Sequence, residues 1–405
     1  MPLPKKIIYV TREIERALGM PPGHDYLIAA DRTPYGESIK RQYPDFITLI
    51  DGTSEKPMGT DDLLQNEKVR KLVLDNGGTV LVFKNTPRIE PIAIENGWTL
   101  LNPKASLGEK IENKLSQIEW LGELGPLYLP THSLQVTKNI AWTGEPFILQ
   151  WGHGHTGSGT ILISSAADLA TIQARFPERM SRVSGYIKGS SFTVNAVVAG
   201  DKVMMSDISY QITGLAPFTD KAFTTIGNDW SVTKTLLTAE DIKAIESMTN
   251  KIGAKLIASG WRGLFGVDIM KDEKNGRIFL IEINARQPAS VTFESFLQEE
   301  SRRQGVVGLT TFEAHINALL GEKIDQPLIP VKAGAQIVQR VTKTIVNMPD
   351  DVAGSLELAG YRVISYPNSK ENEDLIRVQS LDGIMEGDGK FNERGKEILD
   401  IISKS

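Results

Sequence analysis

Three side chains that carry oxygen atoms, Asp268, Glu282 and Asn284, lie in or beside two apolar runs of the chain. The runs, Leu264–Met270 and Arg277–Ile283, are separated by the sequence Asp-Glu-Lys-Asn-Gly, which predicts a β-hairpin. Counting outward from the Asn of this turn places Asp268 opposite Glu282, with Asn284 two residues further on. Because side chains alternate between the two faces of a strand, all three groups are expected on one face of the sheet.

The chemistry of these three groups favours a metal site. Glu282 lies within Phe-Leu-Ile-Glu-Ile, where a carboxylate must be paired, protonated or bound to a cation. Two carboxylates and one amide suit a hard cation such as Mg²⁺. An ordinary hairpin whose acids face water is the alternative, and it is the better interpretation of Asp268 considered alone. The three groups together, with Arg286 two residues beyond Asn284, favour the metal.

Length and composition restrict the class of protein. A chain of 405 residues is too long for one ordinary core, so two or three domains are expected. The net charge of −5 gives no electrostatic case for binding nucleic acid or an anionic membrane. No apolar run approaches the ~20 residues of a membrane helix. The chain has no cysteine, which excludes disulfides and a cysteine-dependent glutaminase within it and favours the cytoplasm.

Residues 1–105 alternate short apolar runs with helical stretches, which predicts an open parallel sheet with helices on both faces. The expected strands are Ile7–Val10, Tyr26–Ala30, Ile47–Ile50, Val80–Phe83 and Trp98–Leu101, and the expected helices are Arg12–Leu18 and Asp61–Leu74. Such sheets bind ligands beyond the carboxyl ends of their strands. Arg12 and residues 31–33 would lie there, although ordinary polar loops explain them equally well.

The next segment combines a helix with a glycine-rich loop. Apolar residues at helical spacing predict one helix over residues 106–125, which Gly125 and Pro126 end. Residues 152–159 contain four glycines between the expected strands Phe147–Gln150 and Ile161–Ser164. Such a loop lets backbone amides approach an anion closely, and its flanking strands argue for a hairpin flap instead of a P-loop. A flexible turn is the alternative.

The remaining chain predicts further strands and helices. The expected strands are Ser191–Ala199, Val203–Ile208, Ala335–Val341, Tyr361–Ser365 and Leu375–Gln379, and the expected helices are Asp168–Arg175, Thr238–Ser259, Ser295–Glu300, Thr311–Leu320 and a charged terminal helix. The polar run 209–214 is interpreted as a loop, either a wall of a substrate site or an ordinary turn. Gly321, Pro327 and Pro330 mark a domain boundary.

Gly-Val-Asp at 266–268, followed fourteen residues later by Glu-Ile-Asn-Ala-Arg at 282–286, resembles the metal-binding end of the ATP-grasp superfamily, in its carboxylate–amine ligase and biotin-carboxylase-like branch. The resemblance implies a mixed α/β and α+β architecture. A pre-ATP-grasp domain with an open parallel sheet (1–105) would precede an ATP-grasp domain (106–330). The glycine-rich lid would occupy about 130–190, and a small C-terminal α+β cap would cover 331–405.

The same resemblance implies ATP and Mg²⁺, or Mn²⁺ in its place, as cofactors. Asp268, Glu282 and Asn284 would hold the metal, and Arg286 and Glu282 would be catalytic, with Arg286 touching the substrate or the transferred phosphoryl group. The implied nucleotide contacts are Lys114, Gln150, Gly152, His153, Gly154, His155, Gly157, Ser158, Gly159, Thr160, Ser184, Gly185, Tyr186, Ile187 and Ser191.

The sequence departs from the family pattern at several of these positions. The family usually has a phosphate-contacting lysine where this chain has Gln150, so either weaker ATP affinity or compensation by another cation is expected. Ser191 stands where an acidic residue often holds the ribose. His153 and His155 form a pair that can ligate a transition metal, but phosphate or substrate hydrogen bonding, or simple exposure, is preferred because no third ligand is evident.

The resemblance implies an ATP-dependent ligase. A small-molecule carboxylate attacks the γ-phosphorus of ATP to give an acyl phosphate and ADP, and an amine then displaces the phosphate to form an amide or peptide bond. Two alternatives stay open: a non-catalytic ATP-binding regulatory module, which Gln150 and Ser191 favour, and a biotin-carboxylase-like subunit acting on a separate carrier. Neither nucleic acid nor a membrane is an expected partner, and a homodimer is the usual prior.

Overall fold

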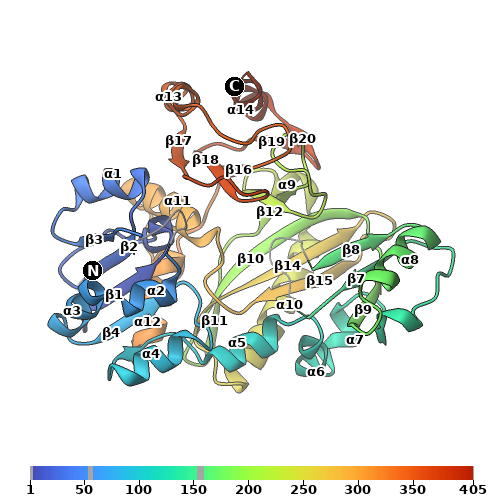
Figure 1. Ribbon diagram of the computed structural model, residues 1–405, viewed down its shortest axis with the longest axis horizontal. Coiled ribbons are helices and arrows are strands. Elements are labelled where there is room, and N and C mark those ends of the chain that lie inside the picture. Colours follow the sequence, from blue (N-terminus) through green and yellow to red (C-terminus); the bar gives the residue numbers. More distant parts are fainter. Residues whose placement is uncertain (1–2, 53–57, 153–158, 405) are drawn as a thin grey trace.

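A five-stranded parallel sheet forms the first domain of the computed structural model, which describes residues 3–52, 58–152 and 159–404 (Figure 1). Its order is β3-β2-β1-β4-β5, and its strands are β1 (Ile7–Thr11), β2 (Tyr26–Asp31), β3 (Ile47–Ile50), β4 (Thr79–Val82) and β5 (Thr99–Leu100). Its helices are α1 (Pro34–Gln42), α2 (Thr60–Gln65), α3 (Glu67–Asp75) and α4 (Ile89–Glu95). The predicted open parallel sheet is confirmed.

Alternation along β1 explains how both faces of this sheet are covered. Ile7 and Tyr9 pack on one side with residues of α1 and of a helix far along the chain, α12 (Thr311–Leu320). Ile8 and Val10 pack on the other side with α2, α3 and α4. The first domain therefore shares part of its core with a helix that follows the hairpin predicted over residues 264–283.

The two helices expected in this domain were wrong in detail, and a further helix was missed. The helix expected at Arg12–Leu18 is only a 3₁₀ turn, η1 (Ile14–Ala17). The helix expected at Asp61–Leu74 is divided at Asn66, whose side chain caps α3 by accepting from the amide of Lys68. Helix α1 was not expected, although Thr33 before a proline is a typical helix start and does cap it.

The single helix expected over residues 106–125 was also wrong. The structure has three short helices, α5 (Ala105–Glu112), α6 (Ser116–Leu121) and α7 (Leu124–Tyr128). The first break follows from Asn113, whose backbone is extended and whose side chain accepts from the amides of Leu115 and Ser116. Lys114 consequently lies in a break between helices instead of on a helix surface.

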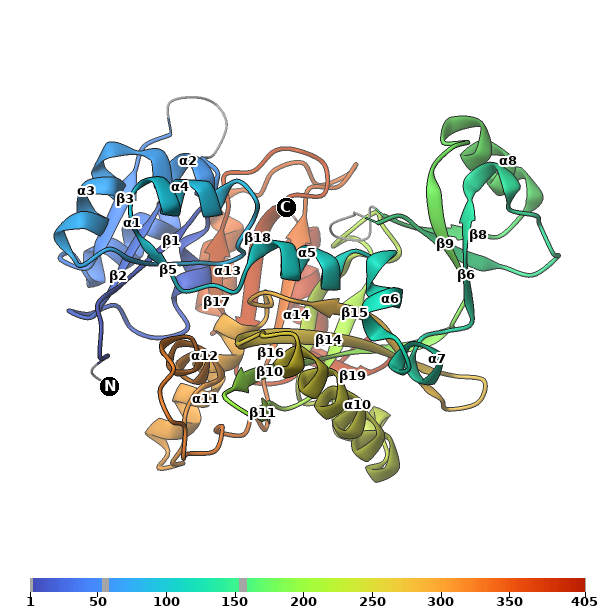
Figure 2. The same cartoon turned by 90° about the horizontal axis from the view of Figure 1, so that it is seen from below.

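A four-stranded antiparallel sheet forms the lid subdomain at the end of the molecule away from the first domain (Figure 2). Its order is β6-β9-β7-β8, and its elements are β6 (His132–Val136), η2 (Thr137–Asn139), β7 (Phe147–Gln150), β8 (Thr160–Ile163), α8 (Ala166–Arg175) and β9 (Met180–Gly185). The expected strands on both sides of the glycine-rich loop are confirmed.

The central sheet has the order β15-β14-β10-β12-β13-β16-β18-β17, with β11 beside β10. Its strands are β10 (Gly189–Ala199), β11 (Lys202–Met205), β12 (Ser209–Thr213), β13 (Thr225–Asp229), β14 (Gly263–Asp272), β15 (Ile278–Asn284), β16 (Ala335–Arg340), β17 (Arg362–Ser365) and β18 (Asp374–Ser380). The polar run 209–214, expected to be a loop, is mainly strand β12. The C-terminal segment adds three strands to this sheet, and the boundary at residue 330 stays a prediction.

The other elements complete the fold. They are α9 (Thr233–Leu236), α10 (Ala239–Ala258), α11 (Val291–Arg303), α13 (Asp350–Leu358), β19 (Met385–Gly387), β20 (Lys390–Phe391) and α14 (Glu393–Ser403). The expected long helix is confirmed as α10, with Thr238 as its N-cap. None of the helices in the described part of the chain has the length and apolar character needed to cross a membrane.

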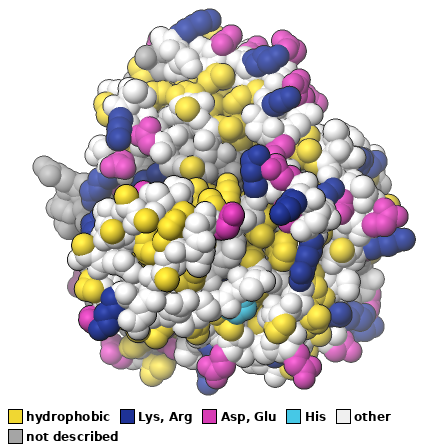
Figure 3. Space-filling model, turned by 90° about the vertical axis from the view of Figure 1, so that its right-hand side faces the viewer, with side chains coloured by type: hydrophobic (Ala, Val, Ile, Leu, Met, Phe, Trp, Pro, Cys, Tyr) yellow, Lys and Arg dark blue, Asp and Glu magenta, His cyan; other side chains and the backbone are white. Residues whose placement is uncertain are grey.

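The face of the molecule drawn in Figure 3 carries Lys and Arg side chains interspersed with Asp and Glu side chains. No broad area of one sign is visible on this face, as the small net charge of −5 leads one to expect.

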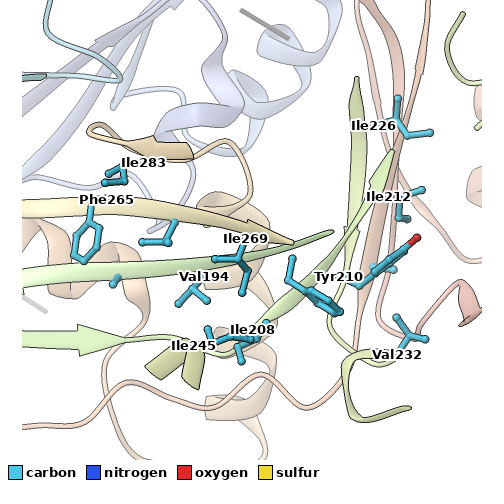
Figure 4. Packing of buried hydrophobic residues seen from close by; sticks show 14 of the residues in the cluster. Val194, Ile208, Tyr210, Ile212, Ile226, Val232, Ile245, Phe265, Ile269 and Ile283 are labelled. Carbon is cyan, nitrogen blue, oxygen red and sulfur yellow. The ribbon is translucent and has the colours of Figure 1, made fainter. Parts of the chain in front are cut away.

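The main core lies between the central sheet and α10 (Figure 4). The side chains that point to this side of the sheet include Phe265 and Ile269, which are four positions apart on β14 and therefore share a face. Val194 of β10 points to the same side. Ile245 of α10 meets them, in a stripe that recurs at helical spacing. The other residues of the same strands, including Thr193 and Asp268, must therefore face the opposite side of the sheet.

Candidate functional site

A cavity of about 900 Å³ lies on that opposite side, and it is lined by residues of the first domain, the lid subdomain and the central sheet. Its volume falls in the range of small-molecule sites. Asp268, Glu282, Asn284 and Arg286 all line it. Two further regions of the wall meet at these residues, one toward the lid and one toward the first domain.

The hairpin of β14 and β15 brings the three expected metal ligands together. Asp268 pairs with Glu282 in the register that the sequence predicted, and Asn284 pairs with Gly266. The side-chain amide of Asn284 donates to Asp268 Oδ2 at 2.9 Å. The three groups therefore do share one face, as expected, while their metal-binding role stays a proposal.

Asp268 receives two more hydrogen bonds from neighbouring strands. Thr193 Oγ1, directly opposite on β10, and Gln211 Nε2 of β12 each donate to Asp268 Oδ1 at 2.8 Å. Desolvation inside the protein and the neighbouring charge of Glu282 nevertheless raise the pKa of Asp268 to about 6. Neither Thr193 nor Gln211 was predicted, although the alternating polar residues of Ser191–Asn195 were a usable signal for the first.

Glu282 has a cationic partner in Lys114. The ammonium Nζ lies 3.0 Å from Glu282 Oε1, and only 8% of Lys114 is exposed. Burial lowers the pKa of Lys114, and the charge of Glu282 only partly offsets it. Desolvation raises the pKa of Glu282, but the charges of Lys114 and Arg286 outweigh this effect and bring it below its ordinary value. Glu282 is therefore ionised at neutral pH.

Arg286 points toward the side of the first domain. Its guanidinium forms an ion pair with Glu112 of α5, which also pairs with Lys84. Two cations thus share one carboxylate at the wall of the cavity. One positive charge at this point is not neutralised by Glu112, which suits the binding of an anionic group there.

The oxygen atoms of Asp268, Glu282 and Asn284 are ligands of the kind that a hard cation prefers. Within residues 3–52, 58–152 and 159–404, no three His, Cys, Asp or Glu side chains converge on one point. Asp268 and Glu282 would thus be the only carboxylate ligands that the described chain supplies, with the amide oxygen of Asn284 beside them. Mg²⁺ typically binds one or two carboxylates and takes its other ligands from phosphates and water, so this set fits it.

Nine of the expected nucleotide contacts line the cavity. Those that line it are Lys114, Gln150, Gly159, Thr160, Ser184, Gly185, Tyr186, Ile187 and Ser191. Gly152 is not among the residues that line it, and its carbonyl accepts from the amide of Lys114 at 3.2 Å, which ties the lid loop to the helix break. His153, Gly154, His155, Gly157 and Ser158 fall outside the described residues.

Gln150 does not stand alone at the end of β7. Arg182 of β9 lies opposite it and donates to Gln150 Oε1 from Nε at 3.0 Å and also from Nη2. Arg182 was not among the expected site residues. No spacing rule could have identified it, because its position depends on the pairing of β7 with β9.

The side of the cavity toward the first domain is rich in arginine. Arg12, Arg16, Arg340 and Arg377 line it. Arg340 and Arg377 both pair with Asp374, at 3.1 and 3.0 Å, and Arg16 pairs with Glu13 at 3.0 Å. Arg12 was expected at the carboxyl end of β1 and lines the cavity there, whereas residues 31–33 do not.

Comparisons with known proteins identify the domain family of the middle of the chain. Residues 111–290 match the family model of the ATP-grasp domain, which confirms the resemblance inferred from the motifs. A sequence search of curated proteins finds no match.

Solved structures share the fold over nearly the whole chain. An N5-carboxyaminoimidazole synthetase from Staphylococcus aureus is 12% identical with a TM-score of 0.65, covering 100% of this chain and 98% of that chain. An N5-carboxyaminoimidazole synthase from Aspergillus clavatus, in complex with ADP and 5-aminoimidazole ribonucleotide, is 14% identical with a TM-score of 0.63, covering 99% of each chain.

The biotin carboxylase domain of the Hydrogenobacter thermophilus 2-oxoglutarate carboxylase, a dimer in complex with MgADP, ADP and bicarbonate, is also similar. It is 14% identical with a TM-score of 0.60, covering 93% of this chain and 85% of that chain. At these identities the likeness establishes the fold, and the predicted ATP-grasp architecture with a preceding parallel-sheet domain is confirmed.

Proposed function

We propose, from the premise that residues 111–290 form an ATP-grasp domain, that this chain is an ADP-forming ligase. It would activate a small-molecule carboxylate with ATP in the presence of Mg²⁺, and would join it to an amine. The observation that carries the proposal is the meeting of Asp268, Glu282 and Asn284 on one face of a hairpin, in the same cavity as Lys114 and Arg286.

The chemistry assigned to the site has two steps. A carboxylate oxygen of the substrate attacks the γ-phosphorus of ATP, the bond to the β,γ-bridging oxygen breaks, and ADP leaves with the electron pair. The amine then attacks the acyl phosphate carbon, inorganic phosphate leaves, and the amine loses a proton. Mg²⁺, which Asp268, Glu282 and Asn284 would hold, would supply positive charge to stabilise the first step.

The side chains have separate roles in this scheme. Asp268, held by three hydrogen bonds, and the ionised Glu282 would position the metal. Lys114 would contact the nucleotide at the lid side. Arg286, with more positive charge around it than Glu112 neutralises, would bind the transferred phosphoryl group or the substrate carboxylate.

The arginine-rich wall supports an anionic substrate. Arg12, Arg16, Arg340 and Arg377 line the same cavity as Arg286, and Glu13 and Asp374 pair with three of them. A substrate with a carboxylate or phosphate in addition to the reacting group would suit this wall. The neighbours in the solved structures, with their bicarbonate and ribonucleotide ligands, support small anionic substrates in the same fold.

Two alternatives are distinguished by the conditions under which ADP is released. A biotin-carboxylase-like subunit, which the Hydrogenobacter neighbour favours, would release ADP only with bicarbonate and a biotinylated carrier. A regulatory module would bind MgATP without releasing ADP. The predicted homodimer and the predicted cytoplasmic location stay predictions.

The testing experiment measures ADP and phosphate release from MgATP with pooled carboxylates and pooled amines. Glu282→Gln is run in parallel, with Glu273→Gln as the control, because Glu273 lies in the turn of the same hairpin and pairs with exposed Lys188. Release that needs both pools and is lost only in Glu282→Gln establishes the ligase. Nucleotide binding without release under every pool, including bicarbonate with a biotinylated carrier, would contradict it.

A further inference from the structure

Strand β7 ends in Gln150, and the side-chain amide of this residue forms hydrogen bonds within the protein. Gln150 Oε1 accepts two bonds from the guanidinium of Arg182, and Gln150 Nε2 donates to Thr160 Oγ1 at 3.0 Å. Only 5% of Gln150 is exposed. Its carbonyl oxygen is therefore engaged in holding Arg182, and one of its two N–H donors is engaged by Thr160.

Arg182 carries a charge that no carboxylate neutralises by direct contact in the described part of the chain. Its residue is 4% exposed, it lines the cavity, and its Nη1 has no hydrogen-bond partner among the described residues. Leaving a buried charged donor unsatisfied is costly. Burial lowers the pKa of Arg182 to about 10, so the guanidinium still keeps its proton at neutral pH. An anion in the cavity would satisfy both its charge and its free donor.

The position of Arg182 also bears on the replacement of the family's usual lysine by Gln150. β7 and β9 are neighbours in the lid sheet, and Gln150 and Arg182 face each other in their register. A long side chain on either strand can reach the same part of the cavity, because paired residues have their Cβ atoms about 5 Å apart. The positive charge absent from position 150 is thus present on the opposite residue.

We infer that Arg182 binds the phosphate oxygens of the nucleotide through Nη1, and that Gln150 positions its guanidinium for this contact. This inference rests on the nucleotide site of the proposed function, and it names the residue that supplies the charge there. Arg182 would act as a binding residue for a di- or triphosphate group, while Gln150 would be a positioning residue.

The test uses variants in which the positive charge is removed from position 182 of β9 or is moved to position 150 of β7. Binding of MgADP and of adenosine is measured by calorimetry for the wild type, Arg182→Gln, and the double variant Gln150→Lys with Arg182→Gln. Arg182→Gln should weaken MgADP binding by roughly 10- to 100-fold, as expected for a hydrogen bond to a charged group, and leave adenosine binding unchanged. The double variant should recover MgADP affinity to within about fivefold of the wild type.

Arg175→Gln is the matched control, because it removes the same charge from exposed α8 of the same subdomain. It should bind both ligands as the wild type does. The inference is overturned if Arg182→Gln binds MgADP normally, or if it loses adenosine equally, which would indicate a structural role. Should Arg182→Gln not fold, a folded double variant that still binds MgADP more than tenfold weaker would overturn it as well. A wild type that binds no nucleotide would instead refute the proposed function.

Discussion

The ammonium group of Lys114 lies 3.0 Å from a carboxylate oxygen of Glu282, where the break between α5 and α6 meets the hairpin of β14 and β15. Both side chains line the cavity. The pair links a residue expected to contact nucleotide with a residue expected to hold metal. Ligand binding on one side of the pair must therefore alter the electrostatics of the other.

Replacing Lys114 by Gln is expected to weaken MgADP binding by roughly tenfold, because the proposed nucleotide site would lose a buried cation. Lys110→Gln, on the exposed side of α5, should bind MgADP as the wild type does. Calorimetric titration of the two variants checks this. Equal affinities in both would remove Lys114 from the nucleotide site.

Thr193→Val should raise the Mg²⁺ concentration required for ADP binding by about three- to tenfold, since Asp268 loses one of its three donors while the side-chain shape is kept. The check is a Mg²⁺ titration at fixed ADP. Thr213→Val serves as the control, because Thr213 lines the same cavity from β12 and makes no bond to Asp268. A shift of the same size in both variants would show that the bond to Asp268 is not the cause.

Stability should fall as pH rises because of Glu294 on α11. This carboxyl is completely buried, Asn195 Nδ2 donates to it at 3.1 Å, and burial raises its pKa to about 8. Since the folded pKa lies above the unfolded value, the stabilisation is complete below pH ~4.5 and is lost progressively up to pH ~8. The slope is at most ~1.4 kcal/mol per pH unit for one proton.

Glu294→Gln should remove this part of the pH dependence, and urea unfolding between pH 5 and 8 measures it. Glu300→Gln, at the outer end of the same helix and paired with Arg303, should keep the wild-type slope. An unchanged slope in Glu294→Gln would show that the carboxyl is already ionised in the folded protein.

The start of α10 offers a local test of stability. The hydroxyl of Thr238 accepts from the amide of Asp241 at 3.2 Å, and Asp241 Oδ2 accepts from the amide of Thr238 at 2.8 Å. Thr238→Ala should lower the free energy of unfolding by about 1 kcal/mol, whereas Thr238→Ser keeps the cap and should lose little. Denaturant unfolding compares them, and equal losses would mean that the hydroxyl bond contributes nothing.

The hairpin of β14 and β15 was predictable because its register follows from its turn and its apolar pattern. The structure shows one shift in the register of this hairpin. Asp268 pairs with Glu282, but the next residue, Ile269, pairs with Leu280. Ile281 is therefore an extra residue in β15, a β-bulge near the site. Counting from Asn275 gave the correct pair at the site, although the pairs nearer the turn are shifted by one residue.

The remaining parts of the site could not be read from local pattern. Gln211 was placed in a loop because its segment is polar, yet the segment is a strand with one face on the cavity. Arg182 depends on long-range pairing of β9 with β7, which no periodicity reports. The break at Asn113 arises from a side chain that competes for backbone amides, and this outweighed the helical spacing of the apolar residues around it.

The pairing of β13 with β16 has a consequence for how the protein is made. During synthesis, strands β10 to β15 of the central sheet leave the ribosome before residues 335–380, so β13 remains an open edge until those residues emerge. An open sheet edge can pair with strands of other chains. Nascent chains truncated after residue 330 are therefore expected to associate or to recruit chaperones, and a soluble, protease-resistant truncated chain would show that the edge is protected in another way.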